Sequence, residues 1–132
     1  MKKCNRCKKT KEYTEFNVDS RASTGRQSIC RKCGSEKKKE MKDYYREQHL
    51  KSKYGITSKD YEDMLEAQDC RCAICGIEEK YCENQRLAVD HDHESGKVRA
   101  LLCKKCNQGI GLLQDSSEFA YNAFQYLQRF GK

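Results

Sequence analysis

Residues Arg86 to Gly109, RLAVDHDHESGKVRALLCKKCNQG, decide how this 132-residue chain is expected to fold. Two short runs with apolar side chains, 86–89 and 98–102, flank a turn that contains Gly96, which is the pattern of a β-hairpin. The first run leads into Asp-His-Asp-His, and the second leads into Cys-Lys-Lys-Cys-Asn. The stretch therefore predicts a hairpin with titratable side chains after its first strand and a metal-binding knuckle after its second.

Four of the ten cysteines are expected to form a metal site around this hairpin. Cys103 and Cys106 have the spacing of a knuckle, and Cys72 and Cys75 repeat it before a glycine that permits the turn. Two knuckles supply the four thiolates of a tetrahedral zinc site. Because four protein ligands leave no open position for water, this zinc is expected to be structural.

A second pair of knuckles, Cys4 with Cys7 and Cys30 with Cys33, predicts another four-cysteine zinc site. The loop between these knuckles is long, but loop closure penalises extra length only weakly. The segment 1–35 is therefore interpreted as a zinc ribbon with a small hairpin, and the alternative is reduced cysteines in a disordered tail.

A few apolar and thiol side chains remain in the cysteine-rich segments. Tyr13, Phe16 and Val18 form a short apolar set between the first two knuckles. Cys70 and Cys82 are left over as buried or free thiols. Cys70 also lies close enough in the sequence to replace the first ligand of the knuckle that follows it.

Positive charge is concentrated in the first part of the chain. Residues 1–56 contain 17 Lys and Arg against 7 Asp and Glu, whereas residues 57–132 contain 10 against 13, giving the formal net charge of +7. A basic excess of this kind indicates a polyanionic partner such as nucleic acid. No apolar run approaches membrane-spanning length and no signal-peptide pattern follows Met1, so a cytoplasmic location without membrane contact is expected.

Segment 36–56 predicts a charged linker helix, since residues 35–54 lack Gly and Pro and place Glu and Lys at helical spacing. The plain interpretation is a solvated linker. The functional alternative places its basic side chains along phosphates. These side chains are Lys37, Lys38, Lys39, Lys42 and Arg46.

Helices are also expected on both sides of the hairpin. Thr57 and Asp60 form a capping box that opens a helix from Ser58 to about Gln68. A second capping signal at 115–118 opens the last helix. Apolar spacing predicts that this last helix packs in the core through Ala120, Ala123, Phe124 and Leu127.

Asp90, His91 and Asn107 meet the demands of phosphodiester hydrolysis. An imidazole ionises near neutral pH and can take a proton from water. A hard divalent ion can hold the phosphate and stabilise the leaving oxygen, and it prefers the oxygen ligands that Asp90 and Asn107 offer. On a regular strand His91 would point away from Asp90, so a local distortion is expected at His91.

The segment from about Lys53 to Leu127 resembles the recombination endonuclease VII family, a branch of the HNH, or His-Me finger (ββα-metal), nucleases. The matching pieces are YGIT at 54–57, CAICG at 72–76, VDHDH at 89–93, GKVR at 96–99 and LLCKKCN at 101–107. The resemblance implies a small α+β, zinc-stapled fold, in which a ββα-metal core with flanking helices holds one catalytic divalent ion, usually Mg²⁺.

Carried over by residue, the resemblance implies that His91 is the general base, that Asp90 and Asn107 bind the metal, and that His93 is an auxiliary residue near the phosphate. It also implies phosphate contacts from two basic residues of the hairpin, Arg99 and Lys97. A solvated hairpin edge explains the lysine equally well.

The chain is therefore expected to consist of a zinc-ribbon-like domain at 1–35, a basic linker helix at 36–56 and a nuclease domain at 57–132, with two structural zinc ions. The best-known member of the family resolves branched DNA as a dimer through a long C-terminal extension. This chain stops one helix after the site, so we expect the ribbon and the basic helix to supply the grip on DNA. RNA, a homodimer and a protein partner of the ribbon stay open.

The family is common in phage and bacterial genomes, so a phage origin and the cytoplasm of a bacterial host are expected by resemblance. The alternative function is a non-catalytic, zinc-binding module that interacts with nucleic acid or protein. It accounts for the eight paired cysteines and the basic half. It does not account for Asp90, His91 and Asn107 in their places.

Overall fold

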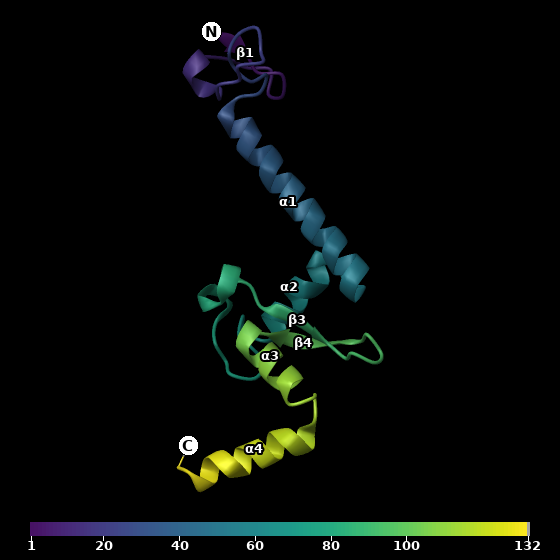
Figure 1. The fold of residues 1–132 in the computed structure, drawn as a ribbon. Helices are drawn as coiled ribbons and strands as arrows, with labels where there is room; N and C mark the ends of the chain where they lie inside the picture. The colour runs from purple at the N-terminus through teal and green to yellow at the C-terminus, as the bar shows by residue number, and fades with distance from the viewer. Residues whose placement is uncertain (132) are drawn as a thin grey trace. The chain divides into compact units, whose positions relative to one another are not determined.

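The chain forms two compact units, residues 1–49 and the part that begins at Leu50. This structure is a computed structural model and describes residues 1–131 (Figure 1). Each unit combines a two-stranded antiparallel sheet with helix and contains one cysteine tetrad, so the predicted small α+β class is confirmed. None of the helices in this range has both the length and the apolar character needed to cross a membrane.

The first unit is built around its cysteines. Its elements are β1 (Lys2–Lys3), β2 (Thr10–Lys11), the 3-10 turn η1 (Tyr13–Glu15) and the first part of helix α1 (Arg31–Tyr54). The buried residues of its core are Cys4, Phe16, Cys30 and Cys33. Of the short apolar set between the knuckles only Phe16 is buried, since Tyr13 and Val18 are 43% and 71% exposed. One aromatic ring and the thiols already fill so small a core.

Helix α1 begins earlier than the sequence predicted, within the second knuckle. The Gly34 N–H donates to the Cys30 carbonyl at 2.9 Å, which starts the helical hydrogen-bond pattern. The helix ends at Tyr54, where the Gly55 N–H donates to the Lys51 carbonyl at 3.0 Å. Gly55 has a φ of 69°, a left-handed conformation that glycine adopts without steric cost, so it is a suitable helix stop.

The second unit has strand–strand–helix order at its centre. Its elements are α2 (Ser58–Ala67), the 3-10 turns η2 (Glu79–Tyr81) and η3 (Glu83–Gln85), β3 (Ala88–His91), β4 (Val98–Leu102), α3 (Lys104–Leu112) and α4 (Ser117–Arg129). Strands β3 and β4 pair antiparallel, α2 contacts β4, and α3 contacts both strands. The buried core consists of Leu50, Tyr61, Leu65, Cys72, Leu87, Val89, Leu101, Leu102 and Cys103.

Two sets of hydrogen bonds fix α2 in this unit. The predicted capping box is confirmed, since the Thr57 hydroxyl accepts from the Asp60 N–H at 3.1 Å and the Asp60 carboxylate accepts from the Thr57 N–H at 2.8 Å. After the end of the helix, the Gln68 amide pairs with both backbone groups of Leu101, each at 2.9 Å. Gln68 therefore hydrogen-bonds to β4 in the way that a neighbouring strand would.

Replacing Tyr61 by Phe is expected to lower the free energy of unfolding by about 1–3 kcal/mol, because a buried polar group loses its partner. The Tyr61 side chain is buried, and its hydroxyl lies 2.7 Å from a Glu79 carboxylate oxygen and 2.9 Å from the Leu87 carbonyl oxygen. Urea unfolding of the metal-loaded protein measures the change. Tyr81→Phe removes the same atom from an exposed ring and should shift stability by less than about 0.5 kcal/mol. Equal effects of the two changes would contradict the explanation.

The last helix, α4, forms as predicted, and the Ser116 hydroxyl caps it by accepting from the Phe119 N–H at 3.2 Å. Its predicted packing in the core is wrong, because none of its residues is buried. Phe124 and Leu127 are 53% and 48% exposed. The buried core of the second unit is complete within residues 50–103, so it leaves this apolar face outside.

Candidate active site

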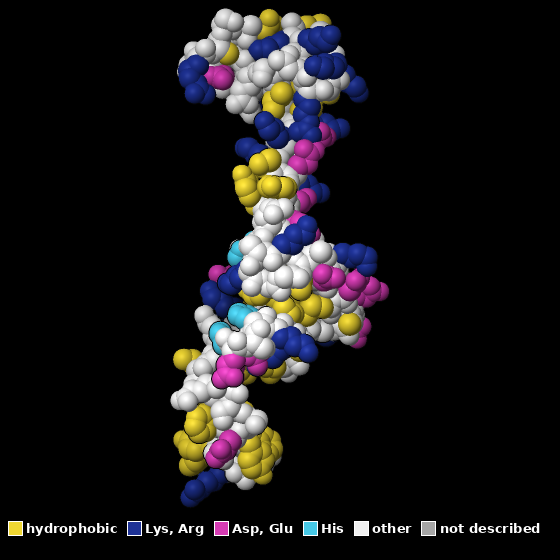
Figure 2. All heavy atoms as spheres, turned by 90° about the vertical axis from the view of Figure 1, so that its right-hand side faces the viewer, with side chains coloured by type: hydrophobic (Ala, Val, Ile, Leu, Met, Phe, Trp, Pro, Cys, Tyr) yellow, Lys and Arg dark blue, Asp and Glu magenta, His cyan; other side chains and the backbone are white. Residues whose placement is uncertain are grey.

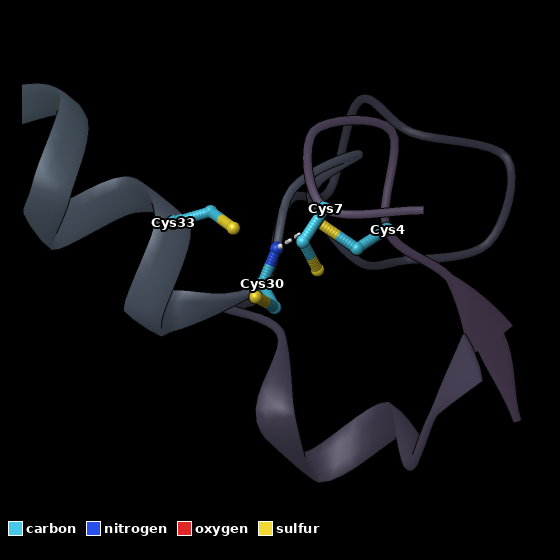
Figure 3. A group of neighbouring side chains, drawn as sticks. All are labelled: Cys4, Cys7, Cys30 and Cys33. Carbon is cyan, nitrogen blue, oxygen red and sulfur yellow. Dashed lines mark hydrogen bonds between the residues drawn. The ribbon is translucent and has the colours of Figure 1, made fainter. Parts of the chain in front are cut away.

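The first cysteine tetrad brings together the four cysteines that the sequence paired. The sulfur atoms of Cys4, Cys7, Cys30 and Cys33 all lie within 4.8 Å of one another. Figure 3 shows that Cys33 reaches this group from helix α1. A tetrahedral ion with bonds of about 2.3 Å places its sulfur ligands about 3.8 Å apart, so the arrangement fits a zinc-sized ion.

The second tetrad links the loop after α2 to the start of α3. The sulfur atoms of Cys72, Cys75, Cys103 and Cys106 also lie within 4.8 Å of one another, and those of Cys75 and Cys103 are 3.7 Å apart. Cys103 is the N-cap of α3, and its sulfur accepts from the Cys106 N–H at 3.4 Å. The leftover cysteine Cys70 is exposed and lies outside this group.

The thiols of each tetrad shift one another's pKa values in opposite directions. Burial raises the pKa of the Cys4 thiol, but hydrogen bonds from the backbone of Cys30, Cys7 and Arg6 outweigh it and hold this pKa at about 6. Burial also raises the pKa of the Cys72 thiol, but hydrogen bonds from the backbone of Cys103, Cys75 and Ile74 outweigh it and lower this pKa to about 6. Burial and the neighbouring thiols raise the pKa of Cys33 to about 12. If all four thiols of a tetrad ionised, their charges would repel one another at this separation, and a zinc ion would offset that repulsion.

The hairpin between the second pair of knuckles is irregular at the predicted place. Asp90 pairs with Ala100, whereas His91 pairs with Val98, so Arg99 is an extra residue on β4. The distortion expected at His91 is confirmed, and it takes the form of a β-bulge in the partner strand. The bulge lies beside the two residues predicted to carry the chemistry.

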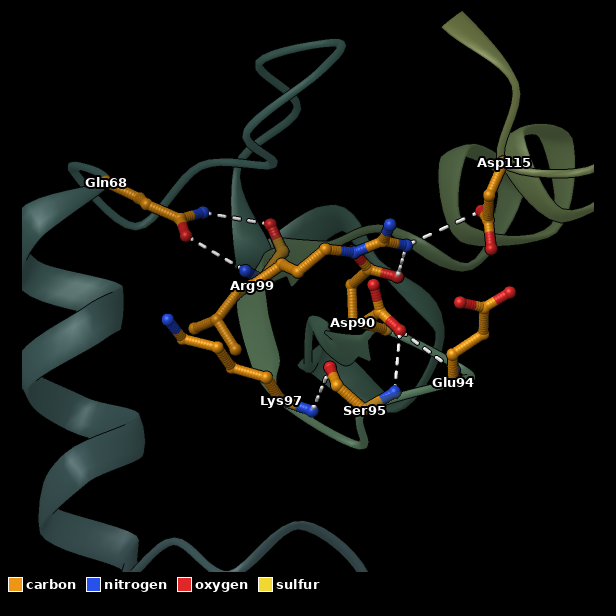
Figure 4. Close-up of polar contacts among 9 residues, drawn as sticks. Gln68, Asp90, Glu94, Ser95, Lys97, Arg99 and Asp115 are labelled. Carbon is orange, nitrogen blue, oxygen red and sulfur yellow. Dashed lines mark hydrogen bonds and ion pairs between the residues drawn. The ribbon is translucent and has the colours of Figure 1, made fainter.

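Asp90 is buried and makes a two-pronged ion pair with Arg99 (Figure 4). The distances are 2.7 Å from Arg99 Nε to Oδ2 and 2.9 Å from Nη2 to Oδ1, and Nη2 lies 3.4 Å from Asp115. The hydrogen bonds to Asp90 raise the pKa of Arg99. Each carboxylate oxygen of Asp90 accepts one hydrogen bond from Arg99 and keeps a further lone pair.

The sequence did not predict this ion pair. An unbroken register would have set Arg99 opposite His91, and only the bulge lets its side chain reach Asp90. The sequence predicts a distortion at His91, but spacing alone does not show that the extra residue is Arg99 on the opposite strand, β4.

His91 lies at the end of β3 among other rings and is partly buried. The ring centroid of His93 is 4.8 Å from that of His91, and the Tyr54 ring meets the His91 ring edge-on at 5.4 Å. His93 is exposed just beyond the strand. The sequence alone predicts no role for Tyr54, although Tyr-Gly-Ile-Thr at 54–57 is part of the resemblance.

The hairpin loop has its own hydrogen bonds. Asp92 accepts from the N–H groups of Ser95 and Glu94 at 2.9 and 2.8 Å, and these two bonds lower its pKa. The Asp92 N–H donates to the Lys97 carbonyl at 2.8 Å. Asp92 therefore closes the loop, and the exposed side chain of Lys97 lies at its far end.

Asn107 lies in the first turn of α3, directly after the last cysteine of the tetrad. Its N–H donates to the Cys103 carbonyl at 3.0 Å, and its side chain is partly buried. Because α3 contacts both β3 and β4, Asn107 and Asp90 lie on contacting elements. The basic residues Lys37, Lys38, Lys42 and Arg46, predicted to contact nucleic acid, lie on α1 within the first unit.

Comparison with known proteins finds relatives among phage proteins. The Gene 59 protein of Mycobacterium phage L5 is 42% identical over 82 residues, which cover 61% of this chain and 49% of that protein. The Gene 59 protein of Mycobacterium phage D29 is 40% identical over 84 residues, covering 63% and 50%. The chain thus spans about half the length of the curated relatives that it matches.

The crystal structure of the beta-beta-alpha-Me type II restriction endonuclease Hpy99I also matches, with a TM-score of 0.40 and 24% identity, covering 97% of this chain and 65% of that one. A family model described as Recombination endonuclease VII matches residues 47–129. This match spans more than half of the chain and includes α2, the hairpin, the second tetrad and α3. The chain therefore belongs to the recombination endonuclease VII family.

Proposed function

We propose that this protein is a metal-dependent endonuclease of the HNH, or His-Me finger, type that hydrolyses phosphodiester bonds in DNA. The observation that carries the proposal is that Asp90 and His91 are neighbours on β3 at a β-bulge. The other strand of this hairpin leads into the second tetrad, which Asn107 follows directly on α3. This arrangement lies inside the segment that matches the family.

His91 is the proposed general base. It takes a proton from the attacking water, because imidazole exchanges protons near neutral pH. The rings of Tyr54 and His93 lie beside it, with centroids 5.4 and 4.8 Å from that of His91. His93 is exposed beside it and is the proposed auxiliary contact to the phosphate.

Asp90 and Asn107 are the proposed ligands of a catalytic divalent ion, Mg²⁺ or another. Such an ion would polarise the phosphate and stabilise the leaving oxygen. Arg99 fixes the orientation of the Asp90 carboxylate and leaves it a lone pair on each oxygen. The guanidinium group keeps Nη1 for a phosphate oxygen, while Lys97 is a further phosphate contact from the loop.

The two tetrads are the proposed sites of two structural zinc ions. Each tetrad fills four positions of a tetrahedral ion and leaves none for water, so neither is the catalytic metal. DNA is the proposed substrate, and the basic residues of α1, Lys37, Lys38, Lys42 and Arg46, are proposed to contact its phosphates. The similarity to phage proteins supports a phage origin and action in the host cytoplasm.

A second candidate function is a binding module that cuts nothing. It is favoured by the ion pair between Arg99 and Asp90, which gives each carboxylate oxygen a hydrogen bond and would serve a purely structural hairpin equally well. The two functions differ in one measurable respect, the cleavage of DNA.

The expected result is cleavage of at least one DNA form by the purified protein when Mg²⁺ is present and none when it is omitted. The forms to compare are supercoiled plasmid, linear duplex, single strands and a four-way junction. Omission of Mg²⁺ is the better control than EDTA alone, because EDTA can also remove zinc from the tetrads. Binding of DNA without cleavage under any divalent ion would leave the binding module as the function.

A further inference from the structure

The first unit contains a cavity of about 620 Å³ that the proposed catalytic chemistry does not use. Its lining includes Asn17, Gln27, Arg31, Lys38, Met41 and Tyr45, all from within residues 1–49. The volume falls in the range of about 300–1,000 Å³ that is usual for ligand sites. Figure 2 shows hydrophobic side chains on α1 close to a group of Lys and Arg side chains.

The α1 wall of this cavity alternates positive charge with apolar surface. Lys38, Met41 and Tyr45 are spaced three and four residues apart and so share one face of the helix. Met41 and Tyr45 are 41% and 63% exposed, although they are large apolar side chains. A long cation and an aromatic ring side by side suit a ligand that has both a negative charge and a flat face.

The rest of the lining includes two side-chain amides, Asn17 and Gln27, from the loop before α1, and Arg31 from its first turn. The Gln27 N–H donates to the Asn17 carbonyl at 2.9 Å, so these two residues lie on adjacent segments of the loop. Arg31 is also held, because its guanidinium group donates to the Thr14 carbonyl. Side-chain amides can both donate and accept hydrogen bonds, which is what recognition of a base edge requires.

We propose that this cavity binds unpaired nucleotides of a single-stranded nucleic-acid segment, with a base against Tyr45 and a neighbouring phosphate against Lys38. The proposal rests on the proposed function, because it names the part of the substrate that the first unit holds.

Charge and shape both favour this occupant. Residues 1–49 contain 15 Lys and Arg against 7 Asp and Glu, a formal net charge of +8, which selects a polyanion. A duplex keeps its bases stacked inside and offers only phosphates to a concave apolar wall. An unpaired base offers its flat face for stacking, and stacking on an aromatic side chain is largely independent of sequence.

The test is fluorescence anisotropy with the full-length, zinc-loaded protein, with Mg²⁺ omitted so that the probes stay intact. The probes are a labelled oligothymidine and a labelled blunt duplex of equal length. Tyr45→Ala should weaken binding of the oligothymidine by about 5- to 150-fold, since stacking contributes about 1–3 kcal/mol per base. Duplex binding should stay unchanged, and Tyr45→Phe should bind the oligothymidine as the unmodified protein does.

Tyr44 offers a matched control. Its ring is 56% exposed on the same helix and meets the Tyr45 ring edge-on, with centroids 5.7 Å apart, but it does not line the cavity, so Tyr44→Ala should cost much less affinity for the oligothymidine than Tyr45→Ala. Lys38 and Lys39 form a second matched pair, because only Lys38 lines the cavity. For the oligothymidine, Lys38→Gln should reduce the slope of log affinity against log salt by about 0.7, and Lys39→Gln should reduce it less. Tyr45→Ala should leave this slope unchanged.

Three outcomes would overturn the inference. These are equal losses for Tyr44→Ala and Tyr45→Ala, an equal loss of duplex and oligothymidine binding for Tyr45→Ala, or no binding of oligothymidine by the unmodified protein. The proposed nuclease function fails separately. If the protein cuts no DNA but Tyr45→Ala weakens oligothymidine binding as expected, it is a single-strand binder. If it cuts DNA but Tyr44→Ala and Tyr45→Ala weaken oligothymidine binding equally, it is a nuclease without this site.

Discussion

His91→Ala is expected to lower the rate of DNA cleavage by about 10²–10⁴-fold, the usual contribution of a positioned acid–base group. Its imidazole is the proposed acceptor of the proton from water, and alanine offers no replacement. DNA affinity and zinc content should stay close to those of the unmodified protein, because His91 belongs to neither tetrad. Single-turnover cleavage at saturating protein separates the chemical step from binding.

His93 and Asn107 supply the comparisons that test the assignment. His93→Ala removes the neighbouring, exposed ring and should slow cleavage less than His91→Ala. Asn107→Ala should be partly rescued by raised Mg²⁺, because it removes one ligand of an ion that usually keeps several waters. Rescue of His91→Ala by Mg²⁺ would instead make His91 a metal ligand and His93 the next candidate for the base.

Features set by local spacing could be predicted from the sequence. The grouping of the cysteines follows from knuckle spacing, and the start of α2 follows from the box formed by Thr57 and Asp60. The irregularity at His91 could be predicted because Asp90 and His91 must act on the same phosphate, whereas a regular strand would point their side chains to opposite faces. In each case a few neighbouring residues determine the geometry.

Features set by tertiary packing could not be predicted in this way. The apolar spacing of α4 indicates an amphipathic helix, but only the complete core shows that its apolar face remains exposed. The contact of Tyr54 with His91 joins the end of α1 to the end of β3, which are far apart in the sequence. The ion pair between Arg99 and Asp90 depends on a one-residue change of register.

Cys72→Ser is expected to unfold the second unit and to lower the zinc content from about two ions per chain to about one. Cys72 is one of the four thiols of the second tetrad, the proposed zinc ligands, and also belongs to the buried core of that unit. Zinc binding by such sites contributes about 10–16 kcal/mol, as much as the whole stability of a typical domain. Elemental analysis and near-ultraviolet circular dichroism measure the two effects, and the first tetrad should keep its ion because none of its ligands has changed.

Cys70→Ser is the matched control, because Cys70 is an exposed thiol two residues away and outside the tetrad. It should keep two zinc ions and the folded second unit. If Cys72→Ser also kept both ions, Cys70 would have replaced Cys72 as a ligand, and the double change Cys70→Ser with Cys72→Ser should then lose one ion. Two ions retained by the double variant would contradict the assignment of the second tetrad, because only three of its thiolates would remain to hold the metal.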